Sequence, residues 1–203
     1  METIERDYWK FCENTEKNIK VRYAADLSYK QFFSKAEINN IHKNLEKNDL
    51  WNFLTLFLKD SSLFRFLKDD ENSHISGLTI PWIYFGMLYS TFCWHVEDLY
   101  LYSVNYMHFG QPKIWYGIPQ NEKEKMDDFI KKEIKKRNID DKNIVHKLVL
   151  LINPENLIKN GIHVYKAVQS PGELIFTLPK AYHCGFSTGF NISEAVNLAV
   201  IYF

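Results

Sequence analysis

The stretch FCWHVEDLYLYSVNYMHFGQPKIWYG, residues 92–117, decides how the whole sequence is interpreted. It is rich in aromatic and β-branched residues, which favour β-strands. His95 and Glu97 nevertheless lie two positions apart within it. Alternate side chains of a strand point to the same face, so we expect both polar groups to project together. Because a buried carboxylate must be paired, protonated or bound to a metal, the pair predicts a site inside a β-fold.

Short runs of similar composition continue on both sides of this stretch. They begin near residue 78, and they resume between residues 164 and 203. Gly and Pro separate them, which is typical of strands joined by turns. Residues 120–137 and 153–161 have helical patterns instead. The sequence therefore predicts a mainly β protein with peripheral helices, folded as a double-stranded β-helix of the jelly-roll or cupin type.

The N-terminal part of the chain has a different pattern. Residues 4–17 have helical spacing, residues 20–26 favour a short strand, and residues 31–50 are polar and predict a loop. The apolar segment 51–67 fits a helix or a buried strand, because periodicity does not distinguish the two here.

No internal repeat or linker divides the sequence. We therefore expect a single domain over residues 1–203. Helices and loops are expected at 1–77, and the jelly-roll core at 78–203. A helical insertion is expected within that core, at about residues 120–160.

The composition excludes several classes of protein. Hydrophobic residues make up 46% of the 203 residues, enough for a sizeable core. The 25 basic and 25 acidic residues balance, so no attachment to nucleic acid through the overall charge is expected. No apolar run approaches the roughly 18 residues that span a bilayer, and no membrane partner is expected. The three cysteines include no CxxC pair, which favours a reducing compartment over a disulfide framework.

A second histidine would complete a metal site with His95 and Glu97. Of the seven histidines, His108 and His183 lie in strand-like runs, and His183 opens the run YHCGFSTGFN. Two histidines and one carboxylate with open positions are the ligands of non-haem Fe(II) oxygenases. Two other interpretations stay open on the residues alone. An H-x-E in a strand is more often structural than catalytic, and Cys93 has the parity to join a zinc site.

Longer motifs carry a family resemblance. The segments FCWHVEDLYLYSVNYMHFGQPKIWYGIP and GELIFTLPKAYHCGFSTGFNISEAVNLA, with RYAADLS and TIPWIYFGM upstream, resemble the JmjC domain of 2-oxoglutarate-dependent histone lysine demethylases. The resemblance runs from about Arg22 to Ala199. Within the family, TIPWIYFGM, FCWHVED and SEAVN favour the JARID type, subfamily five, whereas LYSVNYMHFG favours subfamily four. We favour the JARID type.

The resemblance implies a role for each matching residue. The catalytic residues that bind Fe(II) would be His95, Glu97 and His183. The residues that bind the co-substrate 2-oxoglutarate would be Tyr23, Phe92, Asn105, Lys113 and Trp115. Lys113 and Tyr23 would meet its far carboxylate, Asn105 would lie near its iron-chelating end, and the two aromatic rings would form the walls. The residues that line the methyl-lysine site would be Tyr84, Gly86 and Ala195.

The implied activity uses Fe(II), 2-oxoglutarate and O2 to hydroxylate an N-methyl group of a histone lysine, with release of formaldehyde. Three alternatives stay open: a JmjC hydroxylase with a non-histone substrate, an inactive module that binds methyl-lysine, and a zinc or manganese cupin enzyme. Ser187 and Ala195 depart from residues common in the family, which alters the expected substrate cleft.

The resemblance also implies the surroundings of the protein. The expected partner is a methylated histone tail, the expected location is the nucleus, and the chain is expected to be part of a longer chromatin-associated protein. No direct sequence-specific binding of nucleic acid is expected. Because a histone tail is basic, acidic residues at 68–73 and Asp98 are candidates for the rim of its binding site.

Overall fold

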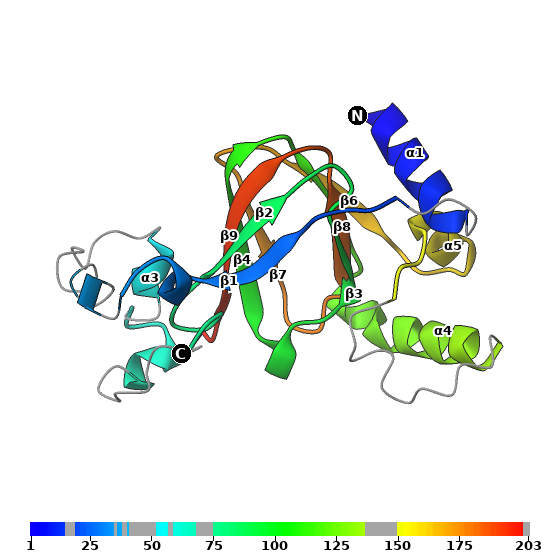
Figure 1. Cartoon of the computed structure of the whole chain (residues 1–203). Coiled ribbons are helices and arrows are strands. Elements are labelled where there is room, and N and C mark those ends of the chain that lie inside the picture. The colour runs from blue at the N-terminus through cyan, green and yellow to red at the C-terminus, as the bar shows by residue number, and fades with distance from the viewer. Residues whose placement is uncertain are drawn as a thin grey trace.

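The computed structural model of the chain describes residues 1–14, 19–34, 36–37, 40, 52–56, 59–67, 75–136 and 150–200. Two antiparallel sheets form its centre (Figure 1). The larger sheet has the strand order β1 (Ala24–Ser28), β2 (Trp82–Gly86), β9 (Asn191–Leu198), β4 (Tyr102–Gly110) and β7 (Leu174–Thr177). The smaller sheet has the order β3 (Thr91–His95), β8 (His183–Ser187), β5 (Lys113–Gly117) and β6 (Tyr165–Gln169).

Strands from distant parts of the sequence pair in both sheets. β9 pairs with β2 and β4 in the larger sheet, and β8 pairs with β3 and β5 in the smaller one. Each of the sequence runs that predicted a strand after residue 78 contributes one. The expected mainly β fold with peripheral helices, of the jelly-roll type, is confirmed.

The helices lie outside the sheets. The α-helices are α1 (Glu2–Glu13), α3 (Phe53–Leu56), α4 (Lys123–Lys136) and α5 (Pro154–Lys159). Short 3-10 turns are η1 (Tyr29–Gln31), η2 (Leu63–Leu67), η3 (Asp98–Tyr100) and η4 (Gln120–Glu122). In Figure 1, α1, α4 and α5 gather on the side of the smaller sheet, and α3 lies on the opposite side. No helix of the described ranges is long and apolar enough to cross a membrane.

The main core lies between the smaller sheet and the helices that cover it. Tyr8 of α1 stacks on Phe186 of β8 with ring centroids 3.7 Å apart, and Trp9 donates a hydrogen bond to the Tyr116 hydroxyl. Met126 and Ile130 of α4 are buried in the same cluster. The outer face of the smaller sheet is therefore held by apolar packing, which leaves its inner face for polar residues.

Three details differ from the sequence predictions or extend them. The described part of segment 51–67 contains the helix α3 and the 3-10 turn η2 and no strand. β1 pairs with β2 in the larger sheet, so that sheet includes a strand from outside the 78–203 range expected for the core. Most of the loop predicted at 31–50, and the acidic segment at 68–73, lie outside the described residues.

Candidate metal centre

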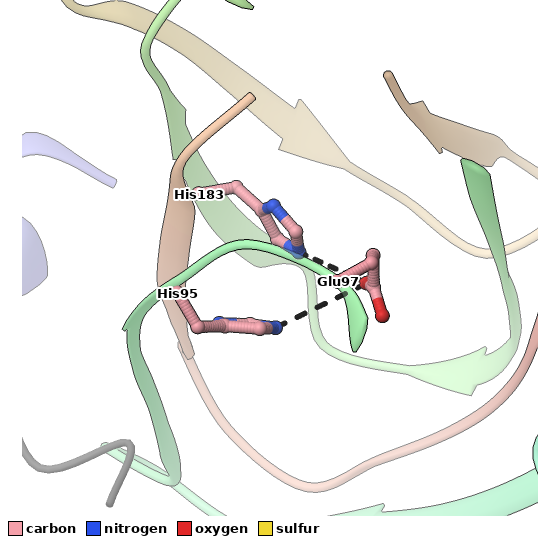
Figure 2. A group of neighbouring side chains, drawn as sticks. All are labelled: His95, Glu97 and His183. Atoms are coloured by element: carbon pink, nitrogen blue, oxygen red, sulfur yellow. Dashed lines mark ion pairs between the residues drawn. The ribbon is translucent and has the colours of Figure 1, made fainter. Parts of the chain in front are cut away.

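Three side chains from two distant parts of the chain converge at one point. One ligand atom each from His95, Glu97 and His183 lies within 4.8 Å of the others. Glu97 Oε1 is 3.3 Å from His183 Nε2 and 4.0 Å from His95 Nε2. Figure 2 shows both imidazoles turned toward the carboxylate. Two nitrogens and one oxygen facing a common point can hold a divalent metal ion and leave other positions open.

The pairing of β3 with β8 brings the two histidines together. His95, the last residue of β3, is the register partner of His183, the first residue of β8. A register shift lies between Phe92 and His95, as in a β-bulge. Bulges re-aim side chains next to functional sites, so this irregularity helps direct His95 inward.

Glu97 is positioned differently from the sequence prediction. It lies beyond the end of β3, immediately before η3, rather than within the strand. Its backbone is still extended, with φ −63° and ψ 147°, so its side chain remains on the side of His95. The chain then turns back through Leu99 and Tyr100, which both have φ of 53°. Such angles are uncommon for non-glycine residues, and strain of this kind clusters at functional sites.

Backbone carbonyls fix the tautomer of both histidines. His95 Nδ1 lies 2.8 Å from the carbonyl oxygen of Cys93, and His183 Nδ1 lies 3.0 Å from that of Ala181. A carbonyl oxygen only accepts hydrogen bonds, so each Nδ1 carries the proton and donates it. Each Nε2 therefore keeps a lone pair directed at the common point. This is how metal-binding histidines are oriented by their outer partners.

The electrostatics keep His95 and Glu97 ready to bind a cation. Burial, with the neighbouring His183, lowers the pKa of His95 to about 4, so its imidazole is neutral at pH 7. Burial alone would raise the pKa of Glu97. Contact with His183 and a hydrogen bond from Asn197 together lower it to about 2. The Asn197 side-chain nitrogen donates to Glu97 Oε2 at 2.8 Å.

A cavity of about 480 Å³ adjoins the three side chains. It is of the size of small-molecule sites in proteins. The residues that line it are Tyr23, Asp26, Trp82, Tyr84, Phe92, His95, Val96, Glu97, Asp98, Ser103, Asn105, Lys113, Trp115, His183, Ala195, Val196 and Asn197. All the predicted site residues except Gly86 are in this set.

Lys113 is the most unusual group of the cavity. Lys113 is 2% exposed, and its Nζ donates a hydrogen bond to Ser193 Oγ at 3.0 Å. No described carboxylate forms an ion pair with it. Burial lowers its pKa to about 8. Because a buried charge without a counter-ion is destabilising, the position is suited to an anionic ligand.

Aromatic rings surround that ammonium group. The Nζ of Lys113 lies 5.9–6.0 Å from the ring centroids of Tyr84, Phe92 and Trp115. Phe92 and Trp115 are themselves in contact, with centroids 4.6 Å apart. An anion bound by Lys113 would therefore lie between apolar walls, where water is excluded and the ionic contact is stronger.

Acidic residues also line the cavity. The Tyr84 hydroxyl donates to Asp26 Oδ1 at 2.8 Å, and Tyr23 lies beside Tyr84 with ring centroids 6.2 Å apart. Burial raises the pKa of both tyrosines, so their hydroxyls stay protonated at neutral pH. Asp98, predicted from the sequence as part of an acidic rim, also lines the cavity.

Ala195 and Gly86 occupy different surroundings. Ala195 on β9 is the register partner of both Trp82 and Asn105, at the centre of the larger sheet. A Cβ on Gly86 would lie 2.7 Å from side-chain atoms of Ser187 and Asn191. The close approach at Gly86 is thus to neighbouring strands, and its role in admitting a peptide stays a prediction.

Three polar residues near the site were not predicted from the sequence. Ser193 and Asn197 contact Lys113 and Glu97 from alternate positions of β9, and Gln169 on β6 contacts Asn105. The alternation of residues 193, 195 and 197 along one strand was the signal that could have indicated the first two.

The other candidate ligands lie elsewhere. His108 contacts Glu194 at 2.7 Å, and His163 contacts Glu122. Cys93 is not among the clustered ligand atoms of the described residues. Of the remaining histidines, 42, 74 and 146 lie outside the described residues.

The sequence is similar to those of known proteins. A family model described as JmjC domain, hydroxylase, matches residues 82–198, more than half of the chain. The chain is 36% identical over 202 residues to Lysine-specific demethylase 5D of Homo sapiens, covering 97% of this chain and 13% of that protein. It is 39% identical over 206 residues to Lysine-specific demethylase JMJ703 of Oryza sativa subsp. japonica, covering 99% and 16%. It is 38% identical over 207 residues to Putative lysine-specific demethylase JMJ16 of Arabidopsis thaliana, covering 99% and 17%. The chain thus spans less than a fifth of the length of these relatives.

Proposed function

The chain belongs to the JmjC-domain hydroxylase family, and from this we propose that it is an Fe(II)- and 2-oxoglutarate-dependent dioxygenase that demethylates methyl-lysine on a histone tail. The observation that carries the proposal is the placement of two imidazoles, a carboxylate and a buried lysine around one cavity. Among the family branches, similarity to Lysine-specific demethylase 5D agrees with the preference for the JARID type, subfamily five.

The donor set fits a ferrous ion. His95 and His183 offer Nε2 lone pairs, and Glu97 is ionised and held by Asn197. Two imidazoles and one carboxylate are the ligands that non-haem Fe(II) oxygenases use, with positions left for substrates. We assign the metal to these three residues.

The interior of the cavity fits 2-oxoglutarate. The ammonium of Lys113, which has no counter-ion among the described residues, is suited to the far carboxylate. Tyr23 adds a protonated hydroxyl to the lining of the same cavity. Phe92 and Trp115 would pack on the carbon chain. Asn105 lines the same cavity and is suited to the chelating end. A co-substrate with a carboxylate at each end would thus bridge from Lys113 to the metal.

The protein would bring the two substrates together and exclude water. When bound, a ferrous ion with 2-oxoglutarate and O2 supplies the oxidation: one oxygen atom becomes a hydroxyl on the N-methyl carbon, and the other enters succinate as CO2 leaves. Lys113 would neutralise the co-substrate, and the aromatic walls would keep the site dry. Glu97 stays ionised as a ligand because contact with His183 and the hydrogen bond from Asn197 hold its pKa at about 2.

The acidic and aromatic residues of the cavity lining fit a methylammonium group. Tyr84 and Trp82 present rings, and Asp26 adds negative charge. A cation is attracted to aromatic faces and to carboxylates without needing a hydrogen on its nitrogen. Ala195, with a small side chain, would leave room for the methyl groups beside the metal.

We also propose the surroundings of the activity. The relatives are named as lysine-specific demethylases, which supports a methylated histone tail as the partner and the nucleus as the location. Because the chain spans 13% to 17% of their lengths, we propose that it acts within a longer chromatin-associated protein. Residues 1–203 would form its single catalytic domain.

Mass spectrometry over a panel of histone peptides, methylated at different lysines and to different degrees, tests the proposal. The expected result is loss of 14 mass units per methyl group, with succinate and formaldehyde in equal amounts. His183→Ala, which removes one ligand, should abolish all three signals. A gain of 16 mass units without formaldehyde would indicate a hydroxylase instead. Peptide binding without any mass change would indicate a methyl-lysine-binding module.

A further inference from the structure

Gln169, the last residue of β6, is a fully buried polar side chain that does not line the cavity. It nevertheless joins two residues that do. The Trp115 indole nitrogen donates to Gln169 Oε1 at 2.9 Å, and Gln169 Nε2 lies 3.1 Å from Asn105 Oδ1. We propose, on the basis of the proposed function, that Gln169 is a positioning residue that fixes the Asn105 amide with its NH2 group toward the co-substrate.

The orientation of Gln169 follows from Trp115. An indole N–H can only donate a hydrogen bond, so its partner must be an acceptor. The Gln169 carbonyl oxygen therefore faces Trp115, and the NH2 group faces β4. That NH2 group has three acceptors: the Asn105 backbone oxygen at 3.1 Å, the Glu173 backbone oxygen at 3.2 Å, and Asn105 Oδ1. A reversed amide would place its one oxygen against these two carbonyl oxygens and leave the indole N–H without an acceptor.

The orientation of Asn105 follows from Gln169. An NH2 group facing the Asn105 side chain requires its oxygen, so Nδ2 occupies the other branch of the amide. The residue is 8% exposed and lines the cavity. Among the described residues no hydrogen bond uses Asn105 Nδ2. Buried donors are rarely left without partners, so this one is kept for a ligand.

The ligand that the donor fits is an acceptor. At neutral pH the oxygens of an oxoacid accept hydrogen bonds and cannot donate them. Asn105 with Nδ2 inward would therefore bind the co-substrate, whereas the flipped amide would place oxygen against oxygen. In the flipped state the Asn105 NH2 group would face the Gln169 NH2 group, so Gln169 makes that state unfavourable. Trp115 thus sets the orientation of the Gln169 amide, and Gln169 sets the orientation of the Asn105 amide that faces the cavity.

The test uses Gln169→Glu, which keeps an acceptor for Trp115 but turns an acceptor toward Asn105. The matched control is Gln120→Glu, the same change at an exposed residue. The protein with Fe(II) is titrated with 2-oxoglutarate without oxygen, and the charge-transfer band gives the dissociation constant. We expect Gln169→Glu to bind 2-oxoglutarate ten- to a hundredfold more weakly, which is the range for loss of a hydrogen bond from a buried donor. The control should change the dissociation constant less than twofold. Fe(II) affinity, measured separately, should change less than twofold in both.

A double-mutant cycle with Asn105→Ala separates positioning from general damage. If Gln169 acts through Asn105, then Gln169→Glu should weaken 2-oxoglutarate binding less than threefold in the Asn105→Ala background. Equal losses in both backgrounds would overturn the proposal, and so would unchanged binding in the single variant. Wild-type protein that holds Fe(II) but binds no 2-oxoglutarate would overturn the proposed function as well.

A measurement on the wild-type protein covers the case in which Gln169→Glu does not fold. With Zn(II) as the redox-inert metal, the side-chain NH2 resonances of Asn105 are identified by their absence in Asn105→Ala. Adding 2-oxoglutarate should shift these two proton signals and slow their exchange with water. Signals that do not respond to saturating 2-oxoglutarate would show that Nδ2 does not meet the co-substrate, and the role of Gln169 would be rejected.

Discussion

His95 and His183 are direct register partners in the ladder between β3 and β8, and their ring centroids lie 4.2 Å apart. Both donate from Nδ1 to a backbone carbonyl two residues earlier in the chain, Cys93 and Ala181 respectively. The two imidazoles are therefore oriented by the same local device on neighbouring strands. Their orientation does not depend on a metal, so the ligand-free site is prepared for binding.

The first prediction concerns His183. Replacing it with Ala removes one of two nitrogen donors, and we expect Fe(II) affinity to fall by at least about a hundredfold. Loss of a residue that only hydrogen-bonds to a metal ligand typically lowers metal affinity by about 10- to 100-fold, and loss of a ligand itself should cost more. The charge-transfer band with 2-oxoglutarate should disappear. Titration with Fe(II) without oxygen measures both effects. The control is His163→Gln, since His163 is paired with Glu122 away from the cavity. Retention of the band in His183→Ala would contradict the assignment.

The second prediction concerns the buried charge of Lys113. Lys113→Met keeps the length of the side chain but removes the charge. Burial depresses the lysine pKa from 10.5 to about 8, so the buried charge destabilises the ligand-free protein. We therefore expect the free energy of unfolding of the ligand-free variant to exceed that of wild type by about 1–3 kcal/mol at pH 7. Binding of 2-oxoglutarate should weaken by about 2–5 kcal/mol, while Fe(II) binding stays within about twofold.

Urea unfolding and the two titrations measure these opposite effects. Lys166→Met serves as the control, because Lys166 pairs with Glu5 on the surface and should alter neither binding constant. Equal weakening of iron and 2-oxoglutarate by Lys113→Met would contradict the assigned role.

The third prediction is a pH dependence from the same lysine. Its folded pKa of about 8 lies below the unfolded value of 10.5, so between these pH values the unfolded chain binds the extra proton. Stability rises with pH where the unfolded state binds more protons, so this contribution of Lys113 should increase from pH 8 to 10.5. Affinity for 2-oxoglutarate should instead decline above about pH 8, because the neutral amine cannot pair with a carboxylate. Subtracting the Lys113→Met profiles isolates both trends, and parallel profiles would rule them out.

The sequence predicted most of the fold because its strands have a local signal. The aromatic and β-branched runs between turns correspond to β2–β9, and the helical patterns at 120–137 and 153–161 correspond to α4 and α5. The sequence predicted a short strand near β1 but not its pairing with the larger sheet. Its partner β2 is more than fifty residues away, and strand pairing has no local signal. The segment 51–67 could not be assigned because its apolar residues fit either period.

The site was predicted less completely, and the reason is physical. The expectation that Glu97 continues the strand was wrong, because the backbone leaves β3 after His95 and turns through Leu99 and Tyr100. Gln169 was missed because its importance depends on partners from β4 and β5, which only the folded sheets bring together. Such second-layer contacts have no spacing rule in the sequence. The roles of the lining residues came from family resemblance and stay predictions.

The fourth prediction tests how tightly the wall of the cavity is packed. Gly185 lies between His183 and Ser187 on β8, and an added Cβ would lie 2.3 Å from the Ile114 carbonyl oxygen and 2.6 Å from Phe92 Cζ. The backbone contact cannot relax easily, so Gly185→Ala should lose about 1–3 kcal/mol of unfolding free energy. It should also displace Phe92 and weaken 2-oxoglutarate binding.

A matched variant on the neighbouring strand distinguishes crowding from a general effect of alanine. A Cβ on Gly117 of β5 would meet nothing within 4 Å, so Gly117→Ala should change stability by no more than about 0.5 kcal/mol and leave 2-oxoglutarate binding unchanged. Chemical unfolding and the anaerobic titration compare the two. If Gly185→Ala were as stable as Gly117→Ala and bound 2-oxoglutarate as wild type does, Phe92 would not be held against β8. Its place as a wall of the co-substrate site would then have to be given up.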